Sequence, residues 1–145
     1  MASPRYDLGQ GGEARAVRAA PVFRSTWRAR AAAMPATRES LPRRWAHVQG
    51  VAARAHSLAP VLGADADLLE AAAWLHDMGY APGLADTGLH ALDGARYLRD
   101  AQHAEAMLCR LVAHHSCAII EADERGLADI LSSEFDPRRM RCPAF

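Results

Sequence analysis

The sequence contains no lysine and no asparagine, and aromatic residues make up only 6% of it. Since lysine is absent, all 17 basic residues are arginine, a bias that is typical of GC-rich coding and indicates no particular chemistry. The hydrophobic half of the chain consists mostly of alanine and leucine, and this composition favours close-packed helices over a β-sandwich. A length of 145 residues suits a single domain with a sizeable core.

Excess charge, long apolar runs and paired cysteines are also lacking. The 17 basic and 17 acidic residues balance to a net charge of zero, so no overall field attracts a nucleic acid polymer or an anionic membrane. No apolar run approaches the roughly 20 residues of a membrane span, and the N-terminus lacks a secretory signal. Cys109, Cys117 and Cys142 are an odd number without a CxxC motif, which indicates reduced thiols. We therefore expect a cytoplasmic protein.

The pattern of apolar residues divides the chain into three parts. Residues 1–38 are poorly patterned and interrupted by proline, which predicts an extension that is mobile or forms an accessory helix. Residues 39–136 carry helical apolar periods and predict a single all-α helical bundle. Residues 137–145 have no helical period and predict an irregular tail.

Capping and breaking residues set the limits of the expected helices. The first begins at Ser40 or Leu41 and ends ahead of Pro60. The third begins at Asp86 or Thr87. The expected helices cover residues 40–59, 65–77, 86–101 and 104–116, followed by residues 121–135 with a break near Gly126.

A histidine and an aspartate stand at the end of the second expected helix. On a helical wheel His76 falls inside the apolar arc, while Asp77 projects about 100° away. Gly79 follows and can take the left-handed conformation that ends a helix. A lone pair of this kind is usually a core histidine beside a solvated carboxylate, so the other histidines decide its meaning.

Five of the seven histidines fall near helix ends or at the edge of the predicted core, whereas His56 and His103 are expected outside it. Gly94, one turn after His90, indicates that another backbone or the site itself comes close there. Buried imidazoles need polar partners, and metal ions would supply them. The five inward histidines are His47, His76, His90, His114 and His115.

This ordered set resembles the HD-domain superfamily of metal-dependent phosphohydrolases over roughly residues 41–135. The resemblance implies a helical bundle whose site lies between the helices and takes one or two divalent transition metal ions, with Fe, Mn, Zn, Co and Ni not distinguished. It implies that His47, His76 and Asp77 hold a first ion. Asp77 would bridge to a second ion. The resemblance assigns this second ion to His90, His114 and His115.

The resemblance also implies a reaction. Family members hydrolyse phosphoesters, so the expected substrate is a nucleotide or a related small phosphate. His76 and Asp77 would be catalytic through the ions they hold. Arg44, within a turn of His47, could contact a substrate phosphate.

One departure from the family pattern supports a different interpretation. The family closes its first metal site with a second aspartate on a later helix. Asp123, Asp129 and Asp136 are the only aspartates after the histidine pair, and none lies in a suitable apolar helix. The chain is therefore expected to end before the closing helix. The alternative function is a catalytically impaired HD domain that binds nucleotide or a partner protein without turnover.

Two further expectations remain. A helical bundle with fortuitous histidines is the purely structural alternative. If the closing helix is missing, an apolar groove should remain beside Leu127, Ile130 and Leu131. An uncovered apolar face favours self-association, so a homo-oligomer is then an alternative to a monomer.

Overall fold

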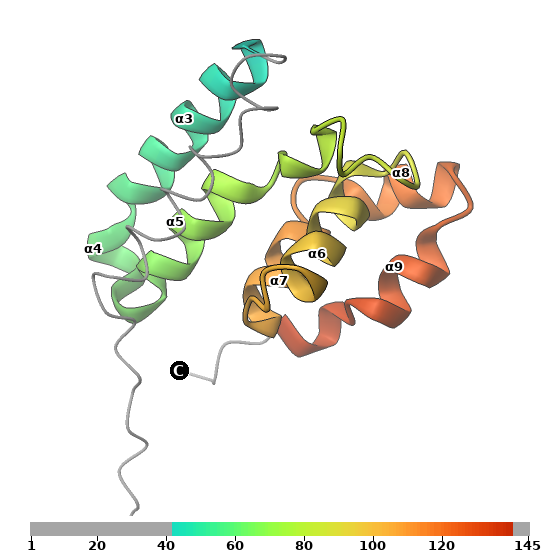
Figure 1. Ribbon diagram of the computed structural model, residues 1–145. Helices are drawn as coiled ribbons and strands as arrows, with labels where there is room; N and C mark the ends of the chain where they lie inside the picture. Colours follow the sequence, from blue (N-terminus) through green and yellow to red (C-terminus); the bar gives the residue numbers. More distant parts are fainter. Residues whose placement is uncertain (1–41, 141–145) are drawn as a thin grey trace, which may run out of the picture.

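A computed structural model of the protein describes residues 42–140, and every regular element in this range is helical, which confirms the all-α class (Figure 1). The predicted extension of residues 1–38 lies outside the described range, as do residues 141–145 of the predicted tail. No helix among residues 42–140 has the length and apolar character needed to cross a membrane. The α-helices are α3 (Pro42–Ser57), α4 (Ala59–Leu62), α5 (Ala66–Leu75), α6 (His90–Asp100), α7 (Ala106–Ala113), α8 (Ala118–Glu124) and α9 (Ala128–Glu134). Within residues 42–140, three short 3-10 helices accompany them: η1 (Gly63–Asp65), η2 (Met78–Tyr80) and η3 (Pro137–Met140).

Helices α3 and α5 lie side by side and form one layer of the fold (Figure 1). Their contact is built from alanines, with Ala52, Ala55 and Ala73 buried against one another. Small side chains allow the two helix backbones to approach closely, and the larger Val51, Leu69 and Trp74 pack against this alanine cluster. At one end of this contact the rings of Trp45 and Trp74 meet, with 5.9 Å between their centroids.

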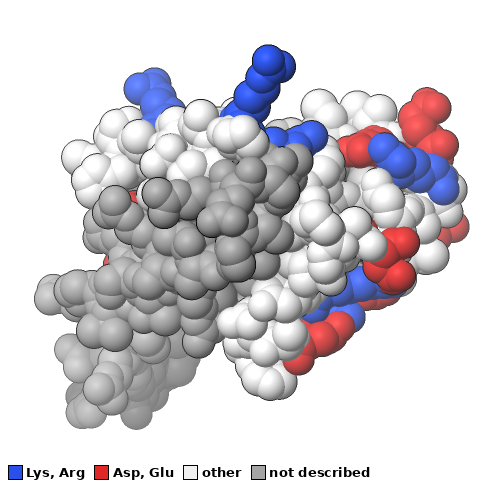
Figure 2. Space-filling view, turned by 45° about the horizontal axis from the view of Figure 1, so that its top comes forward, with Lys and Arg blue, Asp and Glu red and all other residues white. Residues whose placement is uncertain are grey.

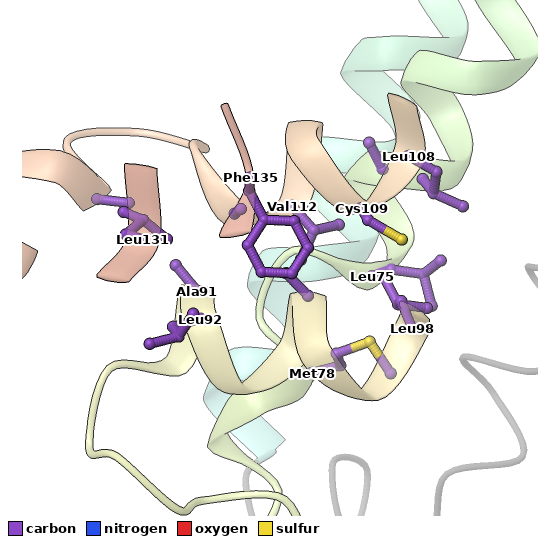
Figure 3. Packing of buried hydrophobic residues seen from close by; sticks show 14 of the residues in the cluster. Leu75, Met78, Ala91, Leu92, Leu98, Leu108, Cys109, Val112, Leu131 and Phe135 are labelled. Atoms are coloured by element: carbon purple, nitrogen blue, oxygen red, sulfur yellow. The ribbon is translucent and has the colours of Figure 1, made fainter. Parts of the chain in front are cut away.

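The main core lies between α5, α6, α7 and α9. Leu92, Leu98, Leu108 and Val112 are fully enclosed there. Figure 3 shows the ring of Phe135, which follows α9, in the middle of this cluster. The core fixes α6 and α7 against the end of α5, where the His-Asp pair lies.

A backbone contact between two glycines joins η2 to α6. A Cβ atom on Gly79 would lie 2.8 Å from the backbone nitrogen of Gly94 and would overlap the carbonyl group of His90. The expectation that a second backbone approaches Gly94 is therefore confirmed. The left-handed conformation expected for Gly79 is wrong, because its φ is not positive. Glycine is needed there for close approach to α6 and not for a helix cap.

Several helix limits differ from the sequence prediction by a few residues, and the structure explains two of these differences. Helix α3 ends ahead of Pro60 as predicted, but at Ser57, and the chain then forms the one-turn α4 with Pro60 in its first turn. Helix α6 begins at His90 rather than at Asp86 or Thr87. The backbone N–H groups of those two residues instead donate to the carboxylate of Asp93, at 3.0 and 3.1 Å. The loop before α6 is thus held by a buried carboxylate in the first turn of that helix.

The predicted groove beside α9 is not formed as expected. Leu131 is fully buried and Leu127 packs against the core, because α9 folds back onto α6 and α7, whereas Ile130 remains 40% exposed. Glu134 anchors this arrangement by accepting hydrogen bonds from Arg96 and Arg99 of α6. An apolar hollow of about 530 Å³ lies instead between α3, α5 and α7. On the face drawn in Figure 2, basic side chains project at the top edge, and acidic side chains lie together with basic ones toward the right-hand end.

Candidate metal centre

The His-Asp pair lies where α5 ends. His76 is the C-cap residue of α5 and Asp77 precedes η2, and both side chains are buried, with relative exposures of 7% and 5%. The amphipathic pattern of α5 directs His76 inward, as the wheel predicts. A buried carboxylate needs cationic or hydrogen-bonding partners, so its surroundings determine its role.

Three imidazole nitrogens face the same oxygen of this carboxylate. The Nε2 atoms of His76, His90 and His115 lie 3.5, 3.7 and 3.9 Å from Oδ1 of Asp77. His90 is the first residue of α6, and His115 comes two residues after the end of α7. The Nε2 atoms of His90 and His115 are themselves 3.0 Å apart. Three separate elements therefore converge on Asp77.

Main-chain contacts fix the tautomers of two of these rings. Nδ1 of His76 donates to the carbonyl of Ala73 at 2.8 Å, and Nδ1 of His115 donates to that of Val112 at 2.6 Å. A neutral imidazole that donates from Nδ1 has an unprotonated Nε2. Both Nε2 lone pairs therefore point toward the carboxylate of Asp77. Acceptors that face one another in a buried site call for a cation between them.

The spacing of these atoms fits a divalent transition metal. Two ligand atoms about 2.1 Å from one ion are roughly 3 Å apart at a right angle and can be at most about 4.2 Å apart. The separations of 3.0 to 3.9 Å among Asp77, His90 and His115 fall within these limits. Neutral imidazole and carboxylate are suitable ligands for several such metals, so the residues fit an ion without selecting one.

A second group of candidate ligands adjoins the first group, which consists of Asp77, His90 and His115. His47 joins His76 and Asp77 in a set whose ligand atoms all lie within 4.8 Å of one another. The rings of His47 and His76 meet edge to face with centroids 5.3 Å apart. His47 is exposed, unlike the other two. Asp77 belongs to both groups, as expected of a bridging carboxylate.

One expected ligand, His114, lies outside both groups. It was predicted to hold the second ion, but its Nε2 donates to the carbonyl of Phe135 at 2.5 Å. Successive residues at the end of a helix point in different directions, so only His115 of the pair reaches Asp77. His56, which bonds Glu70, and His103 are both exposed and lie outside the groups. Among the described residues no further aspartate joins either group, and this includes Asp123, Asp129 and Asp136.

A cavity of about 1020 Å³ opens onto the group of Asp77, His90 and His115. Arg44 of α3 stands at its edge, with its guanidinium 3.5 Å from Oδ2 of Asp77 and 3.2 Å above the ring of Tyr80. Tyr80 in turn stacks on His90 at 3.9 Å. Arg44, Tyr80 and His90 thus form a continuous stack, and Arg44 at one end of it lines the cavity, which places a cation within reach of a bound anion.

Sequence reasoning missed several residues that line this cavity, three of which carry a hydroxyl, thiol or carboxylate group. Ser116 and Cys117 belong to the turn after α7, and Glu121 belongs to α8. No spacing rule identifies them, because their position depends on a turn in which Ser116 has a φ of 50°. Glu121 brings the cavity a second carboxylate, with Oε2 3.8 Å from Nδ1 of His90.

Burial changes the protonation of the two histidines that face each other. Desolvation, reinforced by the nearby His115, lowers the pKa of His90 from 6.5 to about 4. Burial likewise lowers the pKa of His115. Both rings are therefore neutral at physiological pH, which is the state that can bind a metal ion.

These shifts predict a loss of stability in acid. Because the folded pKa of His90 lies below its unfolded value, the unfolded chain binds more protons as the pH falls from about 6.5 to about 4. We expect the free energy of unfolding of the metal-free protein to fall by up to about 3 kcal/mol across this range, and its melting temperature to fall with it. Thermal denaturation at several pH values measures this fall. A His90→Gln variant should lose less stability over the same range. An equal loss would contradict the attribution of this pH dependence to His90.

Comparison with known proteins gives the class of this fold and site. The sequence profile of the HD domain family matches residues 44–141, which is more than half of the chain. The chain therefore belongs to the HD domain family. Searches of curated proteins and of solved structures found no match. HD domains bind divalent metals and belong to a superfamily of metal-dependent phosphohydrolases, in keeping with the two candidate groups around Asp77.

Proposed function

We propose that the protein is a metal-dependent phosphohydrolase that acts on a small phosphoester such as a nucleotide. The observation that carries this proposal is the convergence of three imidazole nitrogens on Oδ1 of Asp77. Asp77, His90 and His115 would hold one ion, and His47, His76 and Asp77 a second. Divalent ions at these positions supply Lewis acidity, lowering the pKa of water and balancing charge on a phosphoryl group.

The residues around the groups have separate roles in this proposal. Val112 and Ala73 orient two ligand rings through their carbonyl oxygens. Asp77, buried and shared by both groups, contributes the negative charge that holds the ions. Arg44 would bind the substrate phosphate, since its guanidinium lies on the cavity wall between Asp77 and Tyr80.

Removing the guanidinium of Arg44 tests its role. We expect Arg44→Ala to lower kcat/KM for a phosphoester about 10- to 100-fold, the loss of one hydrogen bond to a charged group. The loss should appear mainly in KM if the contact exists already in the bound substrate. Steady-state kinetics measures this effect. Arg54→Ala, an exposed arginine of the same helix, is the matched control and should leave both constants unchanged. Equal kinetics for the two variants would remove Arg44 from the substrate site.

Elemental analysis of the purified protein, followed by a panel of phosphomonoesters and phosphodiesters, tests the function itself. Bound transition metal together with turnover of a panel member supports the proposal. Metal-free protein without turnover would refute it.

One observation favours a second candidate, an impaired HD domain that binds its ligand without turnover. The group of His47, His76 and Asp77 offers three ligand atoms, one of them from an exposed side chain, and no further aspartate of residues 42–140 joins it. Metal binding and nucleotide binding without turnover in the panel would identify this candidate.

A further inference from the structure

We propose that Glu121 is a positioning residue for the metal centre, where its carboxylate accepts a hydrogen bond from Nδ1 of His90. The inference rests on the proposed function, because it takes Nε2 of His90 to be a metal ligand. It concerns the second nitrogen of that ring, which neither the family resemblance nor the ligand groups assign.

The first observation is an unpartnered atom. Nδ1 of His90 is fully enclosed and has no hydrogen-bond partner, although the ring is buried. A buried polar atom without a partner is costly and rare in folded proteins. When Nε2 binds a metal, the single proton of the neutral ring must be on Nδ1. This N–H then needs an acceptor.

The position of His90 explains why the main chain does not supply that acceptor. His76 and His115 follow helical turns, so each Nδ1 reaches the carbonyl three residues earlier, at Ala73 and Val112. His90 is the first residue of α6, and the chain before it is a loop rather than a helical turn. The acceptor for this ring must therefore come from a different element.

Glu121 is placed to be that acceptor. Its Oε2 lies 3.8 Å from Nδ1 of His90, about 1 Å beyond a hydrogen bond. Its other oxygen, Oε1, accepts a hydrogen bond from Arg125 at 2.8 Å, so Oε2 is the oxygen directed at the ring. Glu121 lies in the first turn of α8 and is only partly exposed. A small rotation of its side chain would complete a carboxylate–histidine–metal arrangement, which fixes the ring and raises its basicity as a ligand.

Metal affinity tests this role without relying on turnover. We expect Glu121→Ala to weaken Mn²⁺ binding about 10- to 100-fold, the usual cost of losing such a partner. Glu121→Gln, whose amide oxygen can still accept, should retain part of this affinity. Glu124→Gln, on the same helix but exposed, is the matched control and should bind as the wild type does. Calorimetric titration measures all four proteins, with melting temperatures to confirm folding. A Glu121→Ala protein that binds Mn²⁺ as tightly as the wild type would overturn the inference.

A second measurement separates this inference from the proposed function. Long-range ¹H–¹⁵N spectra of the metal-free protein report which nitrogen of His90 carries the proton. We expect Nδ1–H in the wild type and a shift toward Nε2–H in Glu121→Ala. If the wild type shows Nε2–H, with His90 donating to His115 instead, the role of Glu121 is refuted whether or not metal binds. If the wild type shows the expected tautomer but binds no metal, only the proposed function fails.

Discussion

Replacing Asp77 with alanine is expected to abolish metal binding and with it any phosphohydrolase activity. Asp77 is the one residue shared by both ligand groups, and its Oδ1 is the oxygen that His76, His90 and His115 all face. Without it, the imidazoles would lose the negative charge that retains a divalent cation. Since bound metal contributes several kcal/mol of transition-state stabilisation, we expect kcat/KM to fall about 1000-fold or more. Metal content and steady-state kinetics measure the two effects.

The control for this prediction is His103→Asn. His103 is exposed, lies outside both ligand groups and has a φ of 50°, a conformation that asparagine tolerates. The variant should retain both the metal and the activity. An Asp77→Ala protein with full activity would rule out any mechanism that depends on ions at this site.

Replacing Gly79 with alanine is expected to cause the largest loss of stability. The added Cβ would meet the carbonyl of His90 and would lie 2.8 Å from the backbone nitrogen of Gly94. Backbone atoms cannot move aside as a flexible side chain can, so η2 and α6 would have to separate. We expect a destabilisation of about 3 kcal/mol or more, which for a domain of this size lowers the melting temperature by roughly 12 to 24 °C. Differential scanning calorimetry measures this shift.

Gly50 provides the matched control for Gly79. It lies within α3, and a Cβ there would meet no atom within 4 Å. Gly50→Ala should therefore stabilise the protein by about 0.5–1 kcal/mol through helix propensity. The two substitutions are chemically identical and should act in opposite directions. A Gly79→Ala protein as stable as the wild type would show that the helices do not approach as closely as described.

The helical class and the positions of most helices could be predicted, because apolar residues recur at helical spacing within each segment. The same pattern placed His76 and His115 on inward faces and His56 on an outward one. The start of α6 could not be predicted, although its end was. The start depends on the carboxylate of Asp93, which accepts hydrogen bonds from backbone groups earlier in the chain.

Features that depend on contacts between segments far apart in the chain could not be predicted from the sequence. The helical pattern placed His115 inward, but it could not exclude His114 as a second ligand, because that depends on where α7 ends and turns. The role of Gly79 was misjudged for a similar reason, since its need for glycine arises from α6 and not from its own helix. Glu121 carried no signal at all, because only the packing of α8 brings it to His90.

The carbonyl groups that orient His76 and His115 have a consequence for how this sequence can vary. Both acceptors are main-chain oxygens, which are present whatever side chain occupies positions 73 and 112. Substitutions at Ala73 or Val112 can therefore alter the packing of the helices while the tautomers of the two rings stay the same. The tautomers of these two imidazoles therefore depend on the helical turn that precedes each ring, and not on the side chains within that turn. Mutational drift in the surrounding core would thus change stability well before it changed what these two nitrogens can bind.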